Sequence, residues 1–224
     1  MDENLRTFLQ HHSNMKYSLF LKKLKQSIYT PIAQLNAFVH KSTEPLCFED
    51  MKNERFDNIK IGDSWGGFFD CAWFKFTADI ENMQKNLVAV IDVGGEGCIY
   101  NKDGEVIQGI TNVLGMVDNF QTVKGKAVIP LDRIDTFKVG KVLFYADCGN
   151  NGRGGKSSGQ ARFKRADICV FRQDILDLYY DILACYQLLS AVNDNAQKRE
   201  IKAHINKAIS VSYTHLTLPT NSRV

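Results

Sequence analysis

The feature that most constrains the fold is a switch to a hydrophobic period of two after Ser64. Along 71–80, one set of alternate positions is apolar: Ala72, Phe74, Phe76, Ala78 and Ile80. Successive side chains of a strand point to opposite faces, so this alternation predicts an antiparallel strand with one buried face.

Further short strands are predicted on both sides of an Asp-Gly turn. The turn residues Asn101-Lys-Asp-Gly104 supply the positive φ that a tight hairpin needs. The other predicted strands are 87–93, 98–100, 105–107, 126–131, 141–146 and 166–171. Strands at this spacing without intervening helices predict a mainly β fold, an antiparallel, jelly-roll-like β-sandwich.

Helical periodicity flanks the predicted sandwich. Residues 15–29 form an amphipathic pattern that ends near Pro31, and 32–62 are irregular. After residue 171 the period returns to 3.6, which predicts a helix over 172–192. Asn193-Asp194-Asn195 interrupts this pattern, and a second, more polar helix is predicted over 196–209.

Composition excludes several classes of function. The 28 basic and 25 acidic residues nearly balance and form no long runs, which argues against nucleic-acid and membrane partners. The six cysteines lie far apart without a Cys-x-x-Cys pair, which favours reduced thiols. The N-terminus is acidic, and the apolar run that follows is too short for a signal peptide or a membrane span. We therefore expect a cytoplasmic protein.

Two groups of residues are candidates for binding. An aromatic group that includes Trp65 and Trp73 could stack on sugar rings, although alternate aromatics in a strand more often belong to a core. Asn150 and Asn151 lie in a glycine-rich stretch, 149–157, whose spacing does not fit a phosphate-binding loop and which leads into a strand. This stretch is predicted to be an inter-strand loop, with both asparagines as candidate sugar contacts or domain-interface residues.

The residues themselves offer no catalytic arrangement. The five histidines form no Ser-His-Asp or Cys-His pattern, and no pair of carboxylates can be selected for acid–base chemistry. No catalytic, cofactor-binding or metal-binding residue is therefore predicted in this chain.

Four segments in order resemble the region ahead of the catalytic domain in cytosolic-type α-mannosidases of glycoside hydrolase family 38. They are Gly62-Asp-Ser-Trp-Gly-Gly67 running into Cys71-Ala-Trp-Phe-Lys-Phe76, the hairpin Gly95–Gly109, the loop Ala146–Gly152, and Ala166–Phe171 before the long helix. Order and spacing agree over roughly residues 45 to 190.

The resemblance implies a parent enzyme that hydrolyses α-mannosides with retention of configuration. Such enzymes use a carboxylate nucleophile and a divalent metal, usually zinc, held by His and Asp residues of the catalytic domain. Here Lys202-Ala-His-Ile-Asn206 only superficially resembles the first metal-binding stretch, so His204 is predicted to be a surface residue of a helix. The implied partners are the catalytic domain and an α-mannoside oligosaccharide.

Residues 211–220 differ from the continuation expected of this family. The codons GTC TCT TAT ACA CAT CTG ACG CTG CCG ACG encode Val-Ser-Tyr-Thr-His-Leu-Thr-Leu-Pro-Thr in full, and they resemble a sequencing adapter. We therefore expect the reading frame to be truncated near Ser210 and followed by adapter translation.

These inferences predict four segments. They are an N-terminal helical segment (1–45), the sandwich (46–171), a helical linker toward a catalytic domain (172–210) and a non-native tail (211–224). On the linker helix, an apolar stripe that includes Tyr179 and Tyr186 is expected to dock on that catalytic domain. The alternatives are a free-standing carbohydrate-binding or interaction module with no enzyme attached, and the sandwich of a different multi-domain glycosidase.

The tail generates a direct test. Residues translated from an adapter have no evolved partner surface, so 211–224 are expected to be disordered or loosely placed. Deleting them should leave the melting temperature unchanged in a thermal denaturation experiment. A marked loss of stability would mean that the tail is a genuine structural element.

Overall fold

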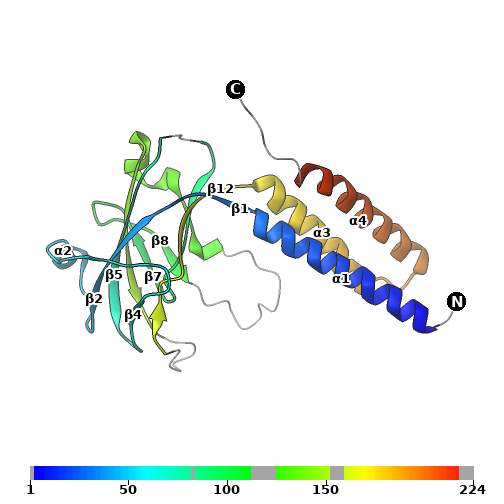
Figure 1. The fold of residues 1–224 in the computed structure, drawn as a ribbon, viewed down its shortest axis with the longest axis horizontal. Coiled ribbons are helices and arrows are strands. Elements are labelled where there is room, and N and C mark those ends of the chain that lie inside the picture. Colours follow the sequence, from blue (N-terminus) through cyan, green and yellow to red (C-terminus); the bar gives the residue numbers. More distant parts are fainter. Residues whose placement is uncertain (1–2, 82–83, 112–124, 152–158, 217–224) are drawn as a thin grey trace. The chain divides into compact units, whose positions relative to one another are not determined.

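A computed structural model describes residues 3–81, 84–111, 125–151 and 159–216. The chain divides into two units, which are considered separately: residues 29–171, and the helices on either side of them in sequence. Figure 1 shows the first unit as packed strands and the second as helices. Residues 152–158 of the glycine-rich loop lie outside the described residues.

The first unit contains a four-stranded antiparallel sheet. Its strand order is β1-β12-β6-β9, and all three pairings are antiparallel. The strands are β1 (Tyr29–Gln34), β12 (Arg165–Phe171), β6 (Leu87–Asp92) and β9 (Val128–Pro130). Every residue of β6 is buried, as expected for a strand inside the sheet with both faces covered.

A six-stranded sheet lies opposite, with the order β3-β2-β5-β10-β7-β8. Its strands are β3 (Asp57–Asn58), β2 (Asn36–Ser42), β5 (Cys71–Asp79), β10 (Lys141–Gly149), β7 (Glu96–Tyr100) and β8 (Val106–Thr111). A small third sheet pairs β4 (Ser64–Gly66) with β11 (Ala161–Arg162). Short helices connect the strands: α2 (Phe48–Met51), η1 (Gly125–Ala127), η2 (Leu131–Arg133) and η3 (Asp135–Val139).

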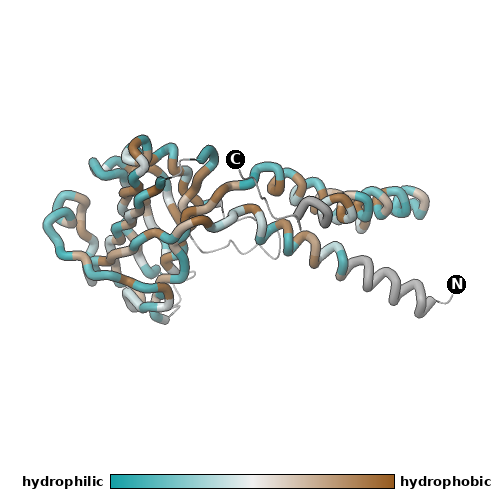
Figure 2. The backbone as a smooth tube through the Cα atoms, turned by 45° about the horizontal axis from the view of Figure 1, so that its top comes forward, coloured by the Kyte–Doolittle hydropathy of each residue, from teal (hydrophilic) through white to brown (hydrophobic). Residues whose placement is uncertain are grey.

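The inner faces of the two large sheets share one core, which confirms the predicted antiparallel sandwich. Phe76 stacks on Phe144 with ring centroids 5.0 Å apart, and all three of Phe74, Phe76 and Phe144 are fully buried. Ala89 and Ile168 of the four-stranded sheet belong to the same cluster. Figure 2 shows hydrophobic residues recurring along the strands, with hydrophilic residues in many of the connections. The alternation predicted over 71–80 therefore marks this core.

The predicted hairpin at Asn101–Gly104 is also confirmed. The Asn101 carboxamide oxygen accepts hydrogen bonds from the backbone N–H groups of Asp103 and Glu105, each at 2.9 Å. Gly104 has a φ of 90°, a conformation that residues with a side chain rarely adopt. The turn thus joins β7 to β8 by local chemistry that the sequence already displays.

The sandwich begins earlier in the chain than the sequence indicates. β1 and β2 lie within the segment 1–45, for which only helical structure was predicted. β1 pairs with the distant β12, and β2 pairs with β5. Pairing with distant segments gives these strands no local hydrophobic period. Pro31 also argues against a strand in the sequence, because proline is tolerated in a sheet only at positions such as the edge strand that β1 forms. The strand region is therefore 29–171 rather than 46–171.

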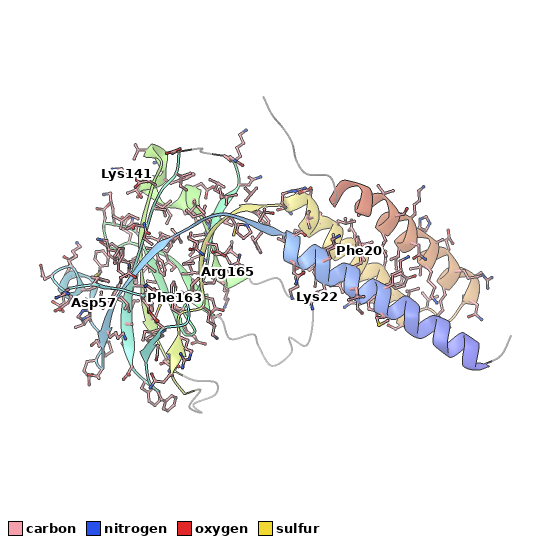
Figure 3. All side chains as sticks on the ribbon, viewed as in Figure 1. Phe20, Lys22, Asp57, Lys141, Phe163 and Arg165 are labelled. Carbon is pink, nitrogen blue, oxygen red and sulfur yellow. The ribbon has the colours of Figure 1, made fainter. Side chains whose placement is uncertain are left out.

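Three helices make the second unit: α1 (Glu3–Ser27), α3 (Gln173–Ala191) and α4 (Asn195–Leu216). Phe20 of α1 is 1% exposed, whereas Lys22 lies on the exposed side of the same helix (Figure 3). Where burial is described, the buried apolar residues of the helical unit are Tyr17, Phe20, Leu21, Leu24, Ile28, Ile175, Tyr179, Ile182, Leu183, Ile205 and Ile209. None of the helices in the described part of the chain has the length and apolar character of a transmembrane span.

The start of α4 follows the predicted break. The Asp194 carboxylate accepts hydrogen bonds from the backbone N–H groups of Ala196 and Gln197, which caps the helix and lowers the pKa of Asp194. At its other end α4 continues to Leu216, so 211–216 are helical rather than loosely placed. A helix can extend by adding one hydrogen bond per residue to turns already formed. Residues 217–224 of the proposed tail lie outside the described part.

The expected apolar patch on α3 is wrong at its centre. Tyr179 is 2% exposed and Ile175 4%, because α1 packs against α3 within the helical unit. Tyr186 is partly exposed, and its ring meets that of Tyr17 edge-on with centroids 6.0 Å apart. The partner of this stripe is therefore a helix of the same chain that lies on the other side of the sandwich in sequence.

Adjacent tyrosines on α3 provide a matched test of this packing. Tyr179 is 2% exposed, whereas Tyr180 is 46% exposed. Tyr179→Lys places an ammonium group in an apolar interior and should lower the free energy of unfolding by about 3 kcal/mol or more. Tyr180→Lys should change it by no more than about 0.5 kcal/mol. Urea unfolding followed by far-ultraviolet circular dichroism measures both; equal effects would contradict the packing.

Candidate functional site

The two tryptophans predicted as sugar contacts are both buried. Trp65 is 2% exposed, and its Nε1 donates a hydrogen bond of 2.6 Å to the carbonyl oxygen of Val93. Trp73 is also 2% exposed, and its Nε1 donates to the carbonyl oxygen of Leu46 at 3.0 Å. Neither ring presents a face to solvent, so the burial of both residues favours the core interpretation over the stacking platform.

Trp73 is buried although it points away from the sandwich core. It lies on the outer face of the six-stranded sheet, where the segment containing α2 covers it. Phe48 of α2 lies over Trp73, Tyr100 and Tyr145, with ring centroids 5.6–5.8 Å apart. Met51 completes this cover and is fully buried. One part of the outer face is thus a second, aromatic core.

The remaining part of this outer face forms an open groove of about 790 Å³, hereafter the outer groove. Its floor comes from four adjacent strands, β5, β10, β7 and β8. The floor residues on the outer face are Cys71, Glu96, Cys98, Gly109, Asp147 and Gly149. Small residues predominate among them, which is why the surface is hollowed here.

The strand register places the polar floor residues side by side. Asp147 is paired with Cys98, and Cys98 is paired with Gly109. Gly149 is paired in the same way with Glu96, which in turn is paired with Thr111. Directly opposed residues on one face have Cβ atoms about 4.5–5.5 Å apart. The two carboxylates therefore lie on neighbouring strands, one position diagonal from each other.

Burial controls the electrostatics of the groove floor. It raises the pKa of the half-buried Asp147 carboxyl above its ordinary value, because the charged form loses hydration. Burial also raises the pKa values of the Cys71 thiol and the Tyr100 hydroxyl, and the negative charge of Asp147 adds to both shifts. The raised pKa makes the Cys71 thiol a poor nucleophile.

The rim of the groove supplies donors as well as acceptors. Lys126, Thr111 and Asn151 line it from the described segments around η1, β8 and β10, and Pro45 closes the side next to α2. Of the two asparagines predicted as sugar contacts, Asn151 is thus exposed and lines the groove. The outward residues Glu96, Thr111, Lys126 and Asp147 were not predicted as site residues; their only sequence signal is their polarity opposite buried neighbours.

The other asparagine, Asn150, has a structural role. It is 2% exposed, and its amide nitrogen donates to the carbonyl oxygens of Gly67 and Gly159 at 2.8 and 3.0 Å. Its backbone carbonyl accepts a hydrogen bond of 2.9 Å from the N–H of Phe69. Asn150 therefore fixes the loop before β5 against the end of β10, and the prediction of a direct sugar contact is wrong at this residue.

Phe69 differs from the other aromatic residues near β5. Its side chain is 62% exposed, and its backbone has a φ of 68°, in the left-handed region. Its ring lies against that of Phe68, with centroids 4.0 Å apart. Phe69 also lies two residues before Cys71 of the groove floor and is bonded to Asn150, between the groove residues Gly149 and Asn151. An exposed aromatic residue thus lies in the chain beside the Cys71–Gly149 end of the groove, although it is not one of the lining residues.

The glycines and acids of the Gly-Asp-Ser-Trp-Gly-Gly stretch hold this loop in place. The Asp63 carboxylate accepts from the N–H of Lys60 at 2.9 Å, and the Asp70 carboxylate accepts from the N–H of Gly67 at 2.7 Å. In the next stretch, a Cβ on Gly97 would collide with the carbonyl oxygen of Asp147. Gly97 therefore allows β7 to pack closely on β10, while Asp63 and Asp70 hold the loop before β5. All three residues have structural roles.

The described residues do not fit a catalytic metal. No three His, Cys, Asp or Glu side chains among them come together as a metal-binding group. His204 lies exposed on α4, which confirms the prediction that it is a surface helix residue. Tyr179 and Tyr186 belong to the helical unit, and the structure does not bring them together with the groove residues in one unit.

Comparison with known families decides the relationship. A family model described as "Alpha-mannosidase, jelly roll domain" (Ams1-like) matches residues 30–169. The chain belongs to this family. The matched span coincides with the strand unit, so the sandwich is an α-mannosidase jelly-roll domain. A search of curated proteins finds no significant match.

Within the jelly-roll domain, the charge of Asp147 should depend on pH in a way that stability reveals. Because its pKa is higher in the folded state, ionisation destabilises the fold, and this cost disappears below the ordinary value of 3.8. Asp147→Asn should therefore raise the free energy of unfolding at neutral pH, with a gain that shrinks as pH falls. Urea titrations at several pH values measure this.

The matched control is Asp79→Asn, an exposed position at the far end of β5. Because this side chain is exposed, the substitution should change the free energy of unfolding by no more than about 0.5 kcal/mol. A constant effect of Asp147→Asn across the titration would contradict the assignment.

Proposed function

We propose that this chain is the non-catalytic N-terminal part of a retaining α-mannosidase of glycoside hydrolase family 38, of the cytosolic type. The observation that carries the proposal is the family match over 30–169, together with the four ordered segments that resemble this region. In the parent protein a catalytic domain follows the helices, and the sandwich packs against it and borders its substrate cleft. The enzyme acts in the cytoplasm on α-mannoside oligosaccharides.

The chemistry of hydrolysis belongs to the catalytic domain in this proposal. That domain supplies the carboxylate nucleophile and the ligands of a divalent metal, with zinc as the expected ion. The described residues of this chain offer no metal-binding group, so no catalytic step is assigned to them. The contribution of the chain is structural support and substrate positioning.

The test is to recover the gene at its source locus and to compare two proteins. The complete product should contain a His/Asp metal-binding strand and a catalytic Asp after the helices. It should hydrolyse an aryl α-mannoside with retention, lose activity with a chelator and regain it with zinc. The present 224-residue chain, purified free of host enzyme, should be inactive under all of these conditions.

Two results would contradict the proposal. One is turnover of the aryl α-mannoside by the present chain, because a nucleophile would then lie within it. The other is a stop codon shortly after the helices, which would favour a free-standing carbohydrate-binding or interaction module.

A further inference from the structure

The outer groove has the size and composition of a small-molecule site. Its volume is about 790 Å³, and ligand pockets range from about 300 to 1,000 Å³. Its lining combines acceptors, Asp147 and Glu96, with the donors Lys126 and Asn151. Such a mixture suits a ligand that both donates and accepts hydrogen bonds at many positions.

Asp147 provides the most specific requirement. Its carboxylate is half-buried on the groove floor, and no group in the described part of the chain donates a hydrogen bond to it. Its oxygens are open to the groove rather than buried without a partner, so hydroxyl groups of a ligand can donate to them in place of water. Glu96, diagonal to Asp147, discourages an anionic ligand in the same groove.

Phe69 adds an apolar element at the end of the groove. Left-handed backbone is unfavourable for a bulky residue, and at exposed positions it points to a role other than packing. Sugar rings have apolar faces that aromatic rings can cover, while their hydroxyl groups need polar partners. The groove floor and Phe69 together offer both.

We infer that the outer groove binds a neutral saccharide, with its hydroxyl groups on Asp147 and Asn151 and a sugar face on Phe69. The choice of α-mannosides among saccharides rests on the proposed function. The site lies on the sandwich itself, so it would hold substrate glycans next to the catalytic domain rather than hydrolyse them.

One variant blocks the groove without disturbing the fold. Gly109 lies on the floor, and a Cβ there would meet only the carbonyl oxygen of Gly97, at 3.8 Å. Gly109→Ile therefore fits in β8, where a β-branched residue is favourable, and fills the groove. The melting temperature should stay constant or rise, while saccharide binding is lost.

Two further variants address the proposed contacts. Phe69→Gly removes the ring and relieves the left-handed backbone, so binding should weaken about tenfold or more without loss of stability. Its matched control is Asn86→Gly, an exposed residue with a φ of 63° outside the groove, which should leave binding unchanged. Asp147→Asn replaces one acceptor by a donor and should also weaken binding about tenfold.

The experiment titrates the 224-residue chain with α-1,2-mannobiose and, for comparison, with maltose. Binding is measured by isothermal titration calorimetry and by changes in amide chemical shifts. The expected result is mannobiose binding that is lost in Gly109→Ile, weakened in Phe69→Gly and Asp147→Asn, and kept in Asn86→Gly. Absence of binding to both sugars, or binding that persists in Gly109→Ile, would overturn the inference. Maltose binding with the same variant pattern would support the site and contradict the mannoside assignment.

Failure of the proposed function can be distinguished from failure of this binding site. The former is measured as the absence of hydrolysis by the complete gene product. The groove variants are read out by binding to the present chain alone, which needs no catalytic domain.

Discussion

The nine-residue antiparallel pairing of β5 with β10 is the constraint on which the rest of the sandwich depends. It runs from Cys71 opposite Gly149 to Asp79 opposite Lys141. Because side chains alternate, this single register sends Phe74, Phe76 and Phe144 into the core. It also sends Asp147 to the outer face. A slip of one residue would place the aromatic residues in solvent and the carboxylate in the core, so core and groove are fixed by the same hydrogen bonds.

The end of this strand pair is held by loop interactions rather than by hydrophobic packing. Asn150 ties the loop before β5 to the end of β10, and Asp70 closes the turn at Gly67. Trp65 makes both a hydrophobic and a polar contact. Its ring packs on Phe74, and its Nε1 donates a hydrogen bond to the carbonyl oxygen of Val93. Each of these polar groups has its partner, as low exposure requires. The groove therefore ends in a rigid frame.

Much of the sandwich could be predicted from local patterns. The alternation over 71–80 and the Asn101–Gly104 turn are local signals, and the structure follows both. β1 and β2 could not be predicted, because their pairing partners lie far along the chain. The same reason explains Tyr179, whose partner helix α1 is separated from α3 by the whole sandwich. Periodicity identifies an apolar face but not what covers it.

The candidate site was harder to predict than the fold for a related reason. The sequence draws attention to Trp65 and Trp73, yet the covering segment around α2 and the loop contacts bury both. The groove is instead formed by what is small: Gly109, Cys98 and Gly149 leave space that no sequence period marks. Asp147 and Glu96 join it only through strand register, which is a property of pairing between segments.

Backbone conformation separates positions where the fold requires glycine from Phe69 and Asn86, the two described non-glycine residues with positive φ. Where the chain takes positive φ among the described residues, glycine occupies most positions, such as Gly62, Gly94 and Gly104. At Gly94 a side chain would collide with the backbone of Arg162, so glycine there is a packing requirement. Phe69 takes the same region of φ with a bulky side chain that is 62% exposed. Folding gains nothing from this choice, because glycine would relieve the backbone and bury no less of the core. The proposed saccharide contact gives this exposed ring a role that the stability of the sandwich does not supply.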